Sequence, residues 1–317
     1  MILNERHEVV ERQLLESGHG HPLQVYRVHN QVGEGPVWDA ARACLWWIDV
    51  RAPELLRLDP ASCALSRWRL PEAVGALALA ADGRLLLALR TQAWLFDPAT
   101  GKLEILAEVE RDRPLNRLNE GKVSPSGRWW LVGSMDDSAG SKQAWGSLYR
   151  IDAAGQALRL HSGLTIANGI AWNADGSRLF FSDSWRGQVW SASWYESEGR
   201  MGPPTLFASS PEDSGRPDGA VVDAQGHYIS AGVSAGCLNR FDAMGRCVEK
   251  TALPCRAPTM PCFGGATGQD LFVTSLLRPQ WSQAPGGLDG QLFCLPGFGN
   301  GKPAALMKLQ ASDIQSI

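Results

Sequence analysis

Four polar side chains stand at matching places in a repeated pattern and could together form a metal-binding site. Glu34 and Asp218 carry carboxylates, and Asn119 and Asn168 carry carboxamides. Two carboxylates held close together repel each other and lose hydration, unless a cation or protons compensate. Carboxylate and amide oxygens without histidine or thiolate are typical ligands of hard cations. We therefore predict one divalent cation per chain, held by Glu34, Asn168 and Asp218, with Ca²⁺ favoured and Zn²⁺, Mn²⁺ or Mg²⁺ as alternatives.

Three protein ligands would leave coordination positions open for water and substrate, which is typical of catalytic metal sites and not of closed structural ones. The alternative interpretation is that these residues begin strands and accept hydrogen bonds from neighbouring backbone amides, as Asp and Asn do at many turns. The two interpretations depend on how the four side chains are placed in the fold.

These side chains belong to a hairpin unit that recurs along the chain. The clearest copy has a strand at Asn168–Trp172, a glycine-containing turn at 173–176 and a second strand at 179–183. A third strand, often ending at an aspartate, follows in most copies, as at Glu54–Asp59. Short strands joined by glycine turns in a unit of about 40 to 50 residues predict the blades of a β-propeller.

Aligning five copies on their turn glycines identifies equivalent positions in the units. The position eight residues before the turn glycine is Gly75, Asn119, Asn168, Asp218 or Met260, and the first unit contributes Glu34. These six positions are separated by 41, 44, 49, 50 and 42 residues. Because the first strand of every blade lines the central channel of a propeller, we expect the six residues to face one another around it.

The fold class predicted is therefore all-β, a six-bladed propeller in a single domain over residues 22–317, preceded by an N-terminal extension over 1–21. The stretch Leu23–Val28 is expected to form the outer strand of the last blade and so to close the ring, which removes open sheet edges. Helix potential is confined to about His7–Ser17, and an α/β fold would need helical stretches between the strands.

Composition limits the class of partner. The chain has 317 residues, 44% of them hydrophobic, and a formal net charge of -3. That charge does not favour nucleic acid or an anionic membrane surface, and the apolar runs fall short of the roughly 20 residues of a membrane span. Seven cysteines without a Cys-x-x-Cys pair argue for reduced thiols. We expect a cytoplasmic protein with a small-molecule ligand, as a monomer or small homo-oligomer.

Four dispersed segments resemble signature segments of the SMP-30/gluconolactonase/regucalcin-like family. They are Gly33–Trp38, Asn116–Lys122, Asn168–Trp172 and Arg216–Gly219, in the family's order, and the resemblance extends from about Val28 to Leu295. It implies a six-bladed propeller, one divalent metal bound by the residues matching Glu34, Asn168 and Asp218, and an activity that opens sugar lactones in carbohydrate metabolism.

The resemblance also implies substrate contacts. Arg117 and Asn119 match family residues that contact the substrate, and Asp137 stands where some members carry a substrate-contacting glutamate. Ile229 departs from the tryptophan of many bacterial members, so no sugar-stacking role is transferred to it. The alternatives for Arg117 and Asp137 are a surface ion pair and an ordinary loop residue.

The expected reaction is hydrolysis of an aldonolactone or aldarolactone to the open-chain acid. Asp218 is assigned as catalytic general base as well as metal ligand, Arg117 as a source of positive charge near the developing oxyanion, and Asn119 as a partner of ring hydroxyls. Two alternatives are retained. One is a paraoxonase-like or phosphotriesterase-like esterase, and the other is a non-enzymatic metal-binding propeller.

Overall fold

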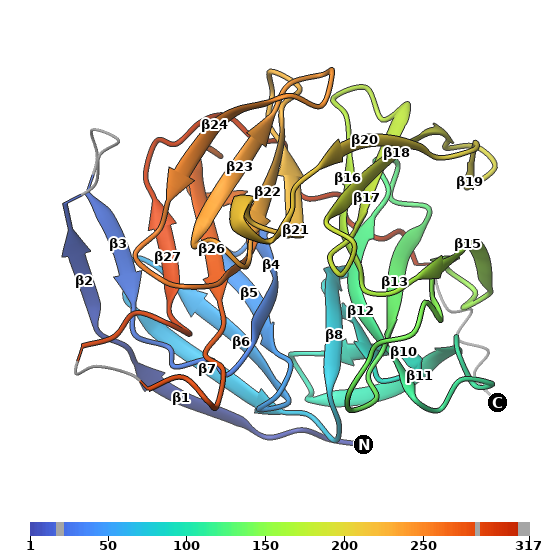
Figure 1. Ribbon diagram of the computed structural model, residues 1–317. Helices are drawn as coiled ribbons and strands as arrows, with labels where there is room; N and C mark the ends of the chain where they lie inside the picture. Colours follow the sequence, from blue (N-terminus) through green and yellow to red (C-terminus); the bar gives the residue numbers. More distant parts are fainter. Residues whose placement is uncertain (17–21, 283–285, 310–317) are drawn as a thin grey trace, which may run out of the picture.

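The predicted hairpins become antiparallel strands that group into six sheets in the computed structural model (Figure 1). The structure describes residues 1–16, 22–282 and 286–309. Within these ranges the only helix is a 3-10 turn at Glu212–Ser214, and none is long and apolar enough to cross a membrane. The chain is an all-β, six-bladed propeller, as predicted.

Blades 1 to 3 follow one another along the chain. The strands of each blade are named here from the innermost to the outermost. Blade 1 contains β4 (Gly33–Asp39), β5 (Cys44–Asp49), β6 (Glu54–Asp59), β7 (Ala64–Arg69) and β1 (Glu5–Val9). Blade 2 contains β8 (Val74–Leu79), β9 (Leu85–Leu89), β10 (Gln92–Asp97) and β11 (Lys102–Glu108). Blade 3 contains β12 (Asn116–Val123), β13 (Trp130–Asp136), β14 (Gly146–Ile151) and β15 (Ala157–Leu164).

The last three blades complete the circle. Blade 4 contains β16 (Ala167–Trp172), β17 (Arg178–Asp183), β18 (Gln188–Tyr195), β19 (Arg200–Met201) and β20 (Thr205–Ser209). Blade 5 contains β21 (Pro217–Val222), β22 (Tyr228–Gly232), β23 (Cys237–Phe241) and β24 (Cys247–Ala252). Blade 6 contains β25 (Pro258–Gly264), β26 (Asp270–Ser275), β27 (Leu292–Leu295), β3 (Leu23–Tyr26) and β2 (Arg12–Leu15).

The ring closes through the N-terminal strand β3, as the sequence predicted. Val25 pairs with Phe293 of β27, so the last blade takes strands from both ends of the described chain. The helical tendency predicted near His7–Ser17 was wrong. The described residues there form strands β1 and β2. These strands pair with β7 and β3, the edges of blades 1 and 6, and satisfy backbone groups that would otherwise stay unpaired.

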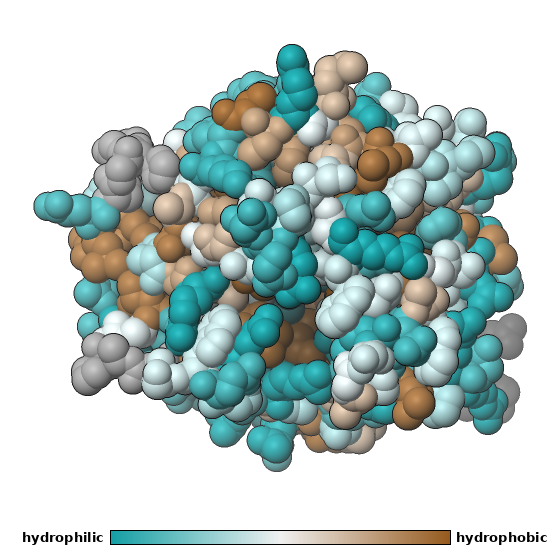
Figure 2. Space-filling view, in the orientation of Figure 1, coloured by the Kyte–Doolittle hydropathy of each residue, from teal (hydrophilic) through white to brown (hydrophobic). Residues whose placement is uncertain are grey.

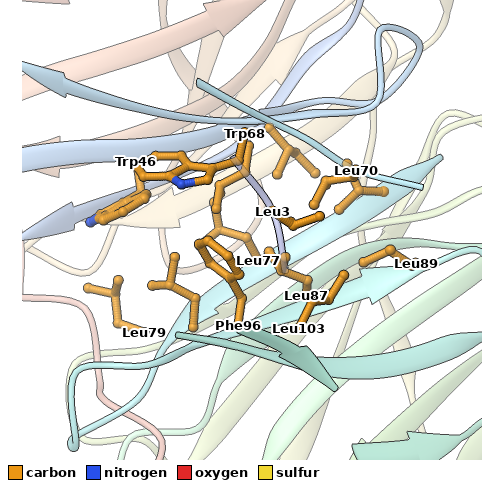
Figure 3. Close-up of a cluster of buried hydrophobic side chains, with 14 of the residues drawn as sticks. Leu3, Trp46, Trp68, Leu70, Leu77, Leu79, Leu87, Leu89, Phe96 and Leu103 are labelled. Atoms are coloured by element: carbon orange, nitrogen blue, oxygen red, sulfur yellow. The ribbon is translucent and has the colours of Figure 1, made fainter. Parts of the chain in front are cut away.

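The main hydrophobic clusters lie between the blades. Six clusters of buried side chains correspond to the six interfaces between neighbouring blades. The cluster between blades 1 and 2 is drawn in Figure 3, where Trp46 and Trp68 stack with ring centroids 5.4 Å apart and Phe96 meets Trp68 edge-on. Because the blades pack against each other, a channel remains along the axis.

The six innermost strands surround that channel, since each contacts the innermost strands of both neighbouring blades. In every blade the pairing between the first and second strands shifts by one residue at or beside the predicted ring position. Such bulges re-aim side chains and occur often near active sites. At Gly75 a Cβ atom would collide with the Leu118 carbonyl, so the small residue lets β8 approach β12 closely.

Candidate active site on the propeller axis

The structure brings the predicted ring residues together. Asn119 on β12 donates a hydrogen bond from Nδ2 to Oδ1 of Asn168 on β16, at 2.7 Å. Glu34 on β4 and Asp218 on β21 lie close enough for the charge of Asp218 to raise the pKa of Glu34. Asn168 and Asp218 are buried, at 5% and 7% exposure. Residues separated by as much as 184 positions of sequence thus share one small volume.

The amide of Asn168 has a fixed orientation. Its Nδ2 donates to Oγ of Ser184 at 2.7 Å, while its Oδ1 accepts from Asn119. The Asn119 amide is oriented in turn, because its own Oδ1 accepts from Arg117 Nη1 at 2.6 Å. A carboxamide oxygen has two lone pairs, so Asn168 keeps acceptor capacity for a cation beside the two carboxylates.

The two axial carboxylates are placed where ionisation is unfavourable among protein groups alone. Burial, followed by the charges of Asp218 and Glu120, raises the pKa of Glu34 well above its ordinary value. Burial and the charge of Glu120 raise the pKa of Asp218 to about 8, against smaller opposing effects of Arg117 and Arg216. A divalent cation between such carboxylates would replace the missing hydration and favour their ionised form.

Glu120 is a further acid near the axis and is buried, and sequence reasoning gave it no role. Its Oε1 accepts the backbone N–H of Ile170 at 2.8 Å, and its Oε2 accepts that of Gly169. Burial raises its pKa to about 7, although Lys122 and the two backbone donors lower it. With both oxygens bonded to the bulge of β16, Glu120 links blade 3 to blade 4 and fixes the backbone next to Asn168.

Arg117 and Asp137 form one unit with a residue of blade 1. Arg117 Nε contacts Asp137 Oδ1 at 3.3 Å, and Arg51 Nη2 contacts the same oxygen at 2.9 Å. The side chains of Arg117 and Asp137 are only 8% and 9% exposed, whereas that of Arg51 is 51% exposed. Asp137 therefore positions Arg117 beside the ring, and this contact is not the surface ion pair considered as an alternative.

The channel beyond the ring is closed at its far end. Residues 300–308 cross the turns of several blades there, with Met307 N donating to Leu79 O and Lys308 N to Gly127 O. They cover a cavity of about 300 Å³, lined by residues that include Leu77, Lys122 and Met260. This C-terminal segment, red in Figure 1, passes behind the blades.

The opposite face gives access to the axis. Figure 2 shows a hollow near its centre, over the region of β4 and β8, with hydrophilic residues around the rim. The loops of Arg51, Asp137 and Ser184 follow second strands of their blades and lie at this end. A small molecule entering from this face would meet Arg117 and then the axial carboxylates.

The side chains present fit a hard divalent cation. Glu34 and Asp218 supply carboxylates, and Asn168 supplies an amide oxygen whose NH₂ is held by Ser184. No group of three or more His, Cys, Asp or Glu side chains with metal-binding geometry occurs in the described part of the chain. A cation here would thus depend on the amide of Asn168 as its third protein ligand.

Several features of the site could not be found from the sequence alone. Ser184, Arg51 and Glu120 act through contacts with residues 16, 86 and 50 positions away, respectively. The sequence contained one local indication that Ser184 lies near the site, because Ser184 directly follows a predicted strand that ends in aspartate. Ile229 is fully buried in the cluster between blades 5 and 6, which agrees with leaving it out of sugar stacking.

Comparison with known proteins adds three kinds of match. Residues 32–277 match the model of the SMP-30/gluconolactonase/LRE-like region. A 6-deoxy-6-sulfogluconolactonase of Pseudomonas putida is 34% identical over 79% of this chain and 85% of its own. An L-arabinolactonase of Azospirillum brasilense is 31% identical over 78% and 81%.

A similar solved structure is that of regucalcin from Agrobacterium tumefaciens, described as a calcium-binding protein. It shares 31% identity with this chain, covers 89% of it and 95% of its own length, and superposes with a TM-score of 0.83. The likeness thus extends over both sequence and fold.

Proposed function

The chain belongs to the SMP-30/gluconolactonase/LRE-like family, and from that premise we propose that it is a sugar lactonase that uses a divalent metal. The reaction is hydrolysis of a sugar-acid lactone to the open-chain acid. The relatives named as lactonases, which match most of the chain, support this activity. The observation that carries the assignment of the site is the axial group of Glu34, Asn168 and Asp218 beneath an arginine at an open channel end.

Glu34, Asn168 and Asp218 are the residues that would hold the metal, with Ca²⁺ favoured. The calcium-binding regucalcin, which is similar over most of the chain, supports that preference. When bound, the cation supplies Lewis-acid chemistry toward the ester carbonyl and favours ionised carboxylates.

Asp218 is the proposed general base of the reaction. Its carboxylate faces the channel and can accept a proton from the attacking water. Among protein groups alone its pKa of about 8 would leave much of the carboxyl protonated at neutral pH, so it acts as a base only when positive charge lies beside it. Its advantage is its position next to the substrate and not a high basicity.

Arg117 and Asn119 bind and orient the lactone. Arg117 is held by Asp137 and by Asn119, and its positive charge is available near an oxyanion that develops at the carbonyl. Asn119 lies between Arg117 and Asn168, and its NH₂ group donates to Ala167 O and Asn168 Oδ1. The second lone pair of its Oδ1 would accept from a substrate hydroxyl. Asp137 acts mainly by holding Arg117 and is the least direct of the proposed contacts.

We also infer a cytoplasmic location. All seven cysteines are free in the structure, and burial raises the pKa of several, including Cys44 to about 11. Thiols of this kind suit a reducing compartment.

The decisive experiment is a panel of aldonolactones and aldarolactones assayed by acid release. The purified protein is tested after chelation and after addition of single divalent metals. We expect turnover that chelation abolishes and one metal restores. Asp218→Ala should reduce kcat by at least about 10³-fold, because ligand and base are lost together. Near-normal turnover in that variant would contradict the assigned site, and no turnover on any lactone would favour a non-enzymatic propeller.

A further inference from the structure

A second arginine lies beside the axial site and has no part in the reaction proposed above. The residues two positions before the ring residues stand at the start of the innermost strands or directly before them, so they form the next layer toward the open end. Four members of this layer are apolar, and two are Arg117 and Arg216, on either side of blade 4. The full layer is Val32, Ala73, Arg117, Ile166, Arg216 and Pro258.

Arg216 is near enough to the axis to act on it. Val233 N donates to Arg216 O, so Arg216 extends the β21–β22 pairing and stands in blade 5 where Arg117 stands in blade 3. Its charge also lowers the pKa of Asp218. Its side chain is 23% exposed and therefore reaches solvent. Arg117, by contrast, is 8% exposed and already bonded to Asp137, the Leu118 carbonyl and Asn119.

The ion-pair partner of Arg216 is easily replaced. Arg216 Nε lies 2.8 Å from Oε2 of Glu212, whose side chain is 70% exposed in the 3-10 turn. An ion pair with one partner so exposed contributes little to stability. An incoming anion can therefore take the place of the Glu212 carboxylate at small cost.

An open pocket with further arginines lies beside Glu212, the ion-pair partner of Arg216. Glu212 lines this pocket of about 660 Å³, together with Arg256, Arg278 and Trp281. The Arg256 and Arg278 guanidiniums lie 4.3 and 5.3 Å from the Trp281 ring centroid. A ligand group larger than a hydroxyl that displaces the Glu212 carboxylate can extend into this pocket, where Arg256 is already paired with Asp289.

We propose that Arg216 is a specificity-determining residue that selects lactones carrying a carboxylate, sulfonate or phosphate at the end remote from the ester carbonyl. This inference rests on the proposed lactonase function. Two residues of strand span about 6.6 Å, which is comparable to the length of a sugar lactone. A substrate with its carbonyl at the axial ring would thus place its far end in the layer of Arg216, whereas the Arg117 guanidinium turns toward the ring and bonds to Asn119 there. There the guanidinium can donate charge-assisted hydrogen bonds to the anionic group.

The test uses one gluconolactone ring with four different groups at its sixth carbon: hydroxyl, carboxylate, sulfonate and phosphate. We expect wild-type protein to prefer at least one anionic lactone over the neutral one. Arg216→Gln should lower kcat/KM for that lactone by about 10- to 100-fold, because a hydrogen bond to a charged group is lost. The neutral lactone should change by less than about threefold, and the ranking of the three anions identifies the group selected.

Two further variants sharpen the result. Glu212→Gln removes the competing carboxylate and should raise kcat/KM for the anionic lactone while leaving the neutral one unchanged. Arg246→Gln is the matched control, because Arg246 is 78% exposed in the same blade and pairs with Asp242 in a distant turn. It removes the same net charge and should alter neither substrate.

An equal loss on neutral and anionic lactones in Arg216→Gln would overturn the inference, and so would no loss on either. If wild-type protein hydrolyses none of the four lactones, the proposed function fails. Calorimetric binding of the same compounds then decides the inference separately. Weaker binding of only the anionic compounds by Arg216→Gln would support it, and equal binding by both proteins would overturn it.

Discussion

At the scale of single residues, the orientation of one amide decides whether the axis can hold a cation. An asparagine can present either oxygen or NH₂ to a site, and only oxygen can bind a cation. Ser184 accepts from Asn168 Nδ2, and Asn119 donates to Asn168 Oδ1, so both ends of the amide are specified. Residues that orient metal ligands in this way commonly matter nearly as much as the ligands themselves.

Ser184→Ala tests this arrangement. The variant removes the acceptor of the Asn168 NH₂ group, and we expect the dissociation constant for Ca²⁺, measured by calorimetry, to rise about 10- to 100-fold. Ser177→Ala is the control, because Ser177 is exposed in a turn of the same blade and its hydroxyl bonds to the turn residues Asp175 and Asn173. An unchanged dissociation constant in Ser184→Ala would mean that Asn168 does not bind the cation through a specified oxygen.

At the scale of elements, the bulge in β16 is the feature that aims Asn168 at the axis. The backbone turns at Gly169, which has φ +64°. Its carbonyl accepts from the Tyr228 hydroxyl at 2.9 Å, and its N–H is bound by Glu120. Blades 3 and 5 thus both hold the bulge of blade 4, so the ligand geometry depends on three blades at once.

Gly169→Ala should break this element. A Cβ atom there would collide with the Tyr228 hydroxyl and crowd Ser182, in a backbone region that disfavours side chains. We expect a loss of about 2 to 4 kcal/mol in unfolding free energy, measured in urea, together with weaker cation binding. Gly226→Ala is matched in backbone strain, with φ +86°, but meets no atom within 4 Å, so it should cost only about 1 kcal/mol. Equal losses in the two variants would contradict the role of the collision.

At the scale of the whole molecule, a cation bound on the axis should link several blades and so stabilise the folded ring. Its proposed ligands come from blades 1, 4 and 5, so only the folded ring can bind it. Binding to the folded state alone stabilises by about 2.7 kcal/mol when the ligand is at 100 times its dissociation constant. Thermal unfolding should therefore shift upward with added Ca²⁺.

That shift should depend on pH, with a sign set by the axial acids. The pKa values of Glu34 and Asp218 are raised in the folded protein, Asp218 to about 8 from an ordinary 3.8. Without added cation the folded chain keeps protons that the unfolded chain has released, so its stability falls as pH rises from about 4 to about 8. Because Ca²⁺ replaces these protons, the gain in Tm on adding it should be larger at pH 8 than at pH 5.5. A gain independent of pH would contradict the placement of the cation between these acids.

The sequence by itself was sufficient for the architecture and for the ring. Hairpins, turn glycines and apolar strands are local patterns, and their regular recurrence predicted six blades, closure by Leu23–Val28 and the six channel positions. Equivalent places in equivalent blades must face one another, so Glu34, Asn119, Asn168 and Asp218 could be grouped without knowledge of any contact.

Only the tertiary structure decided how those residues are supported. Glu120 bonds to the backbone at Gly169, Arg51 reaches Asp137, and Arg216 has the exposed Glu212 as its partner. These contacts join different blades or loops and leave no periodic trace in the sequence. The N-terminal residues show the same limit, since the open edges of blades 1 and 6 turned a helix-like stretch into strands. A repeat predicts which positions meet, whereas the partners available in three dimensions decide what each side chain does.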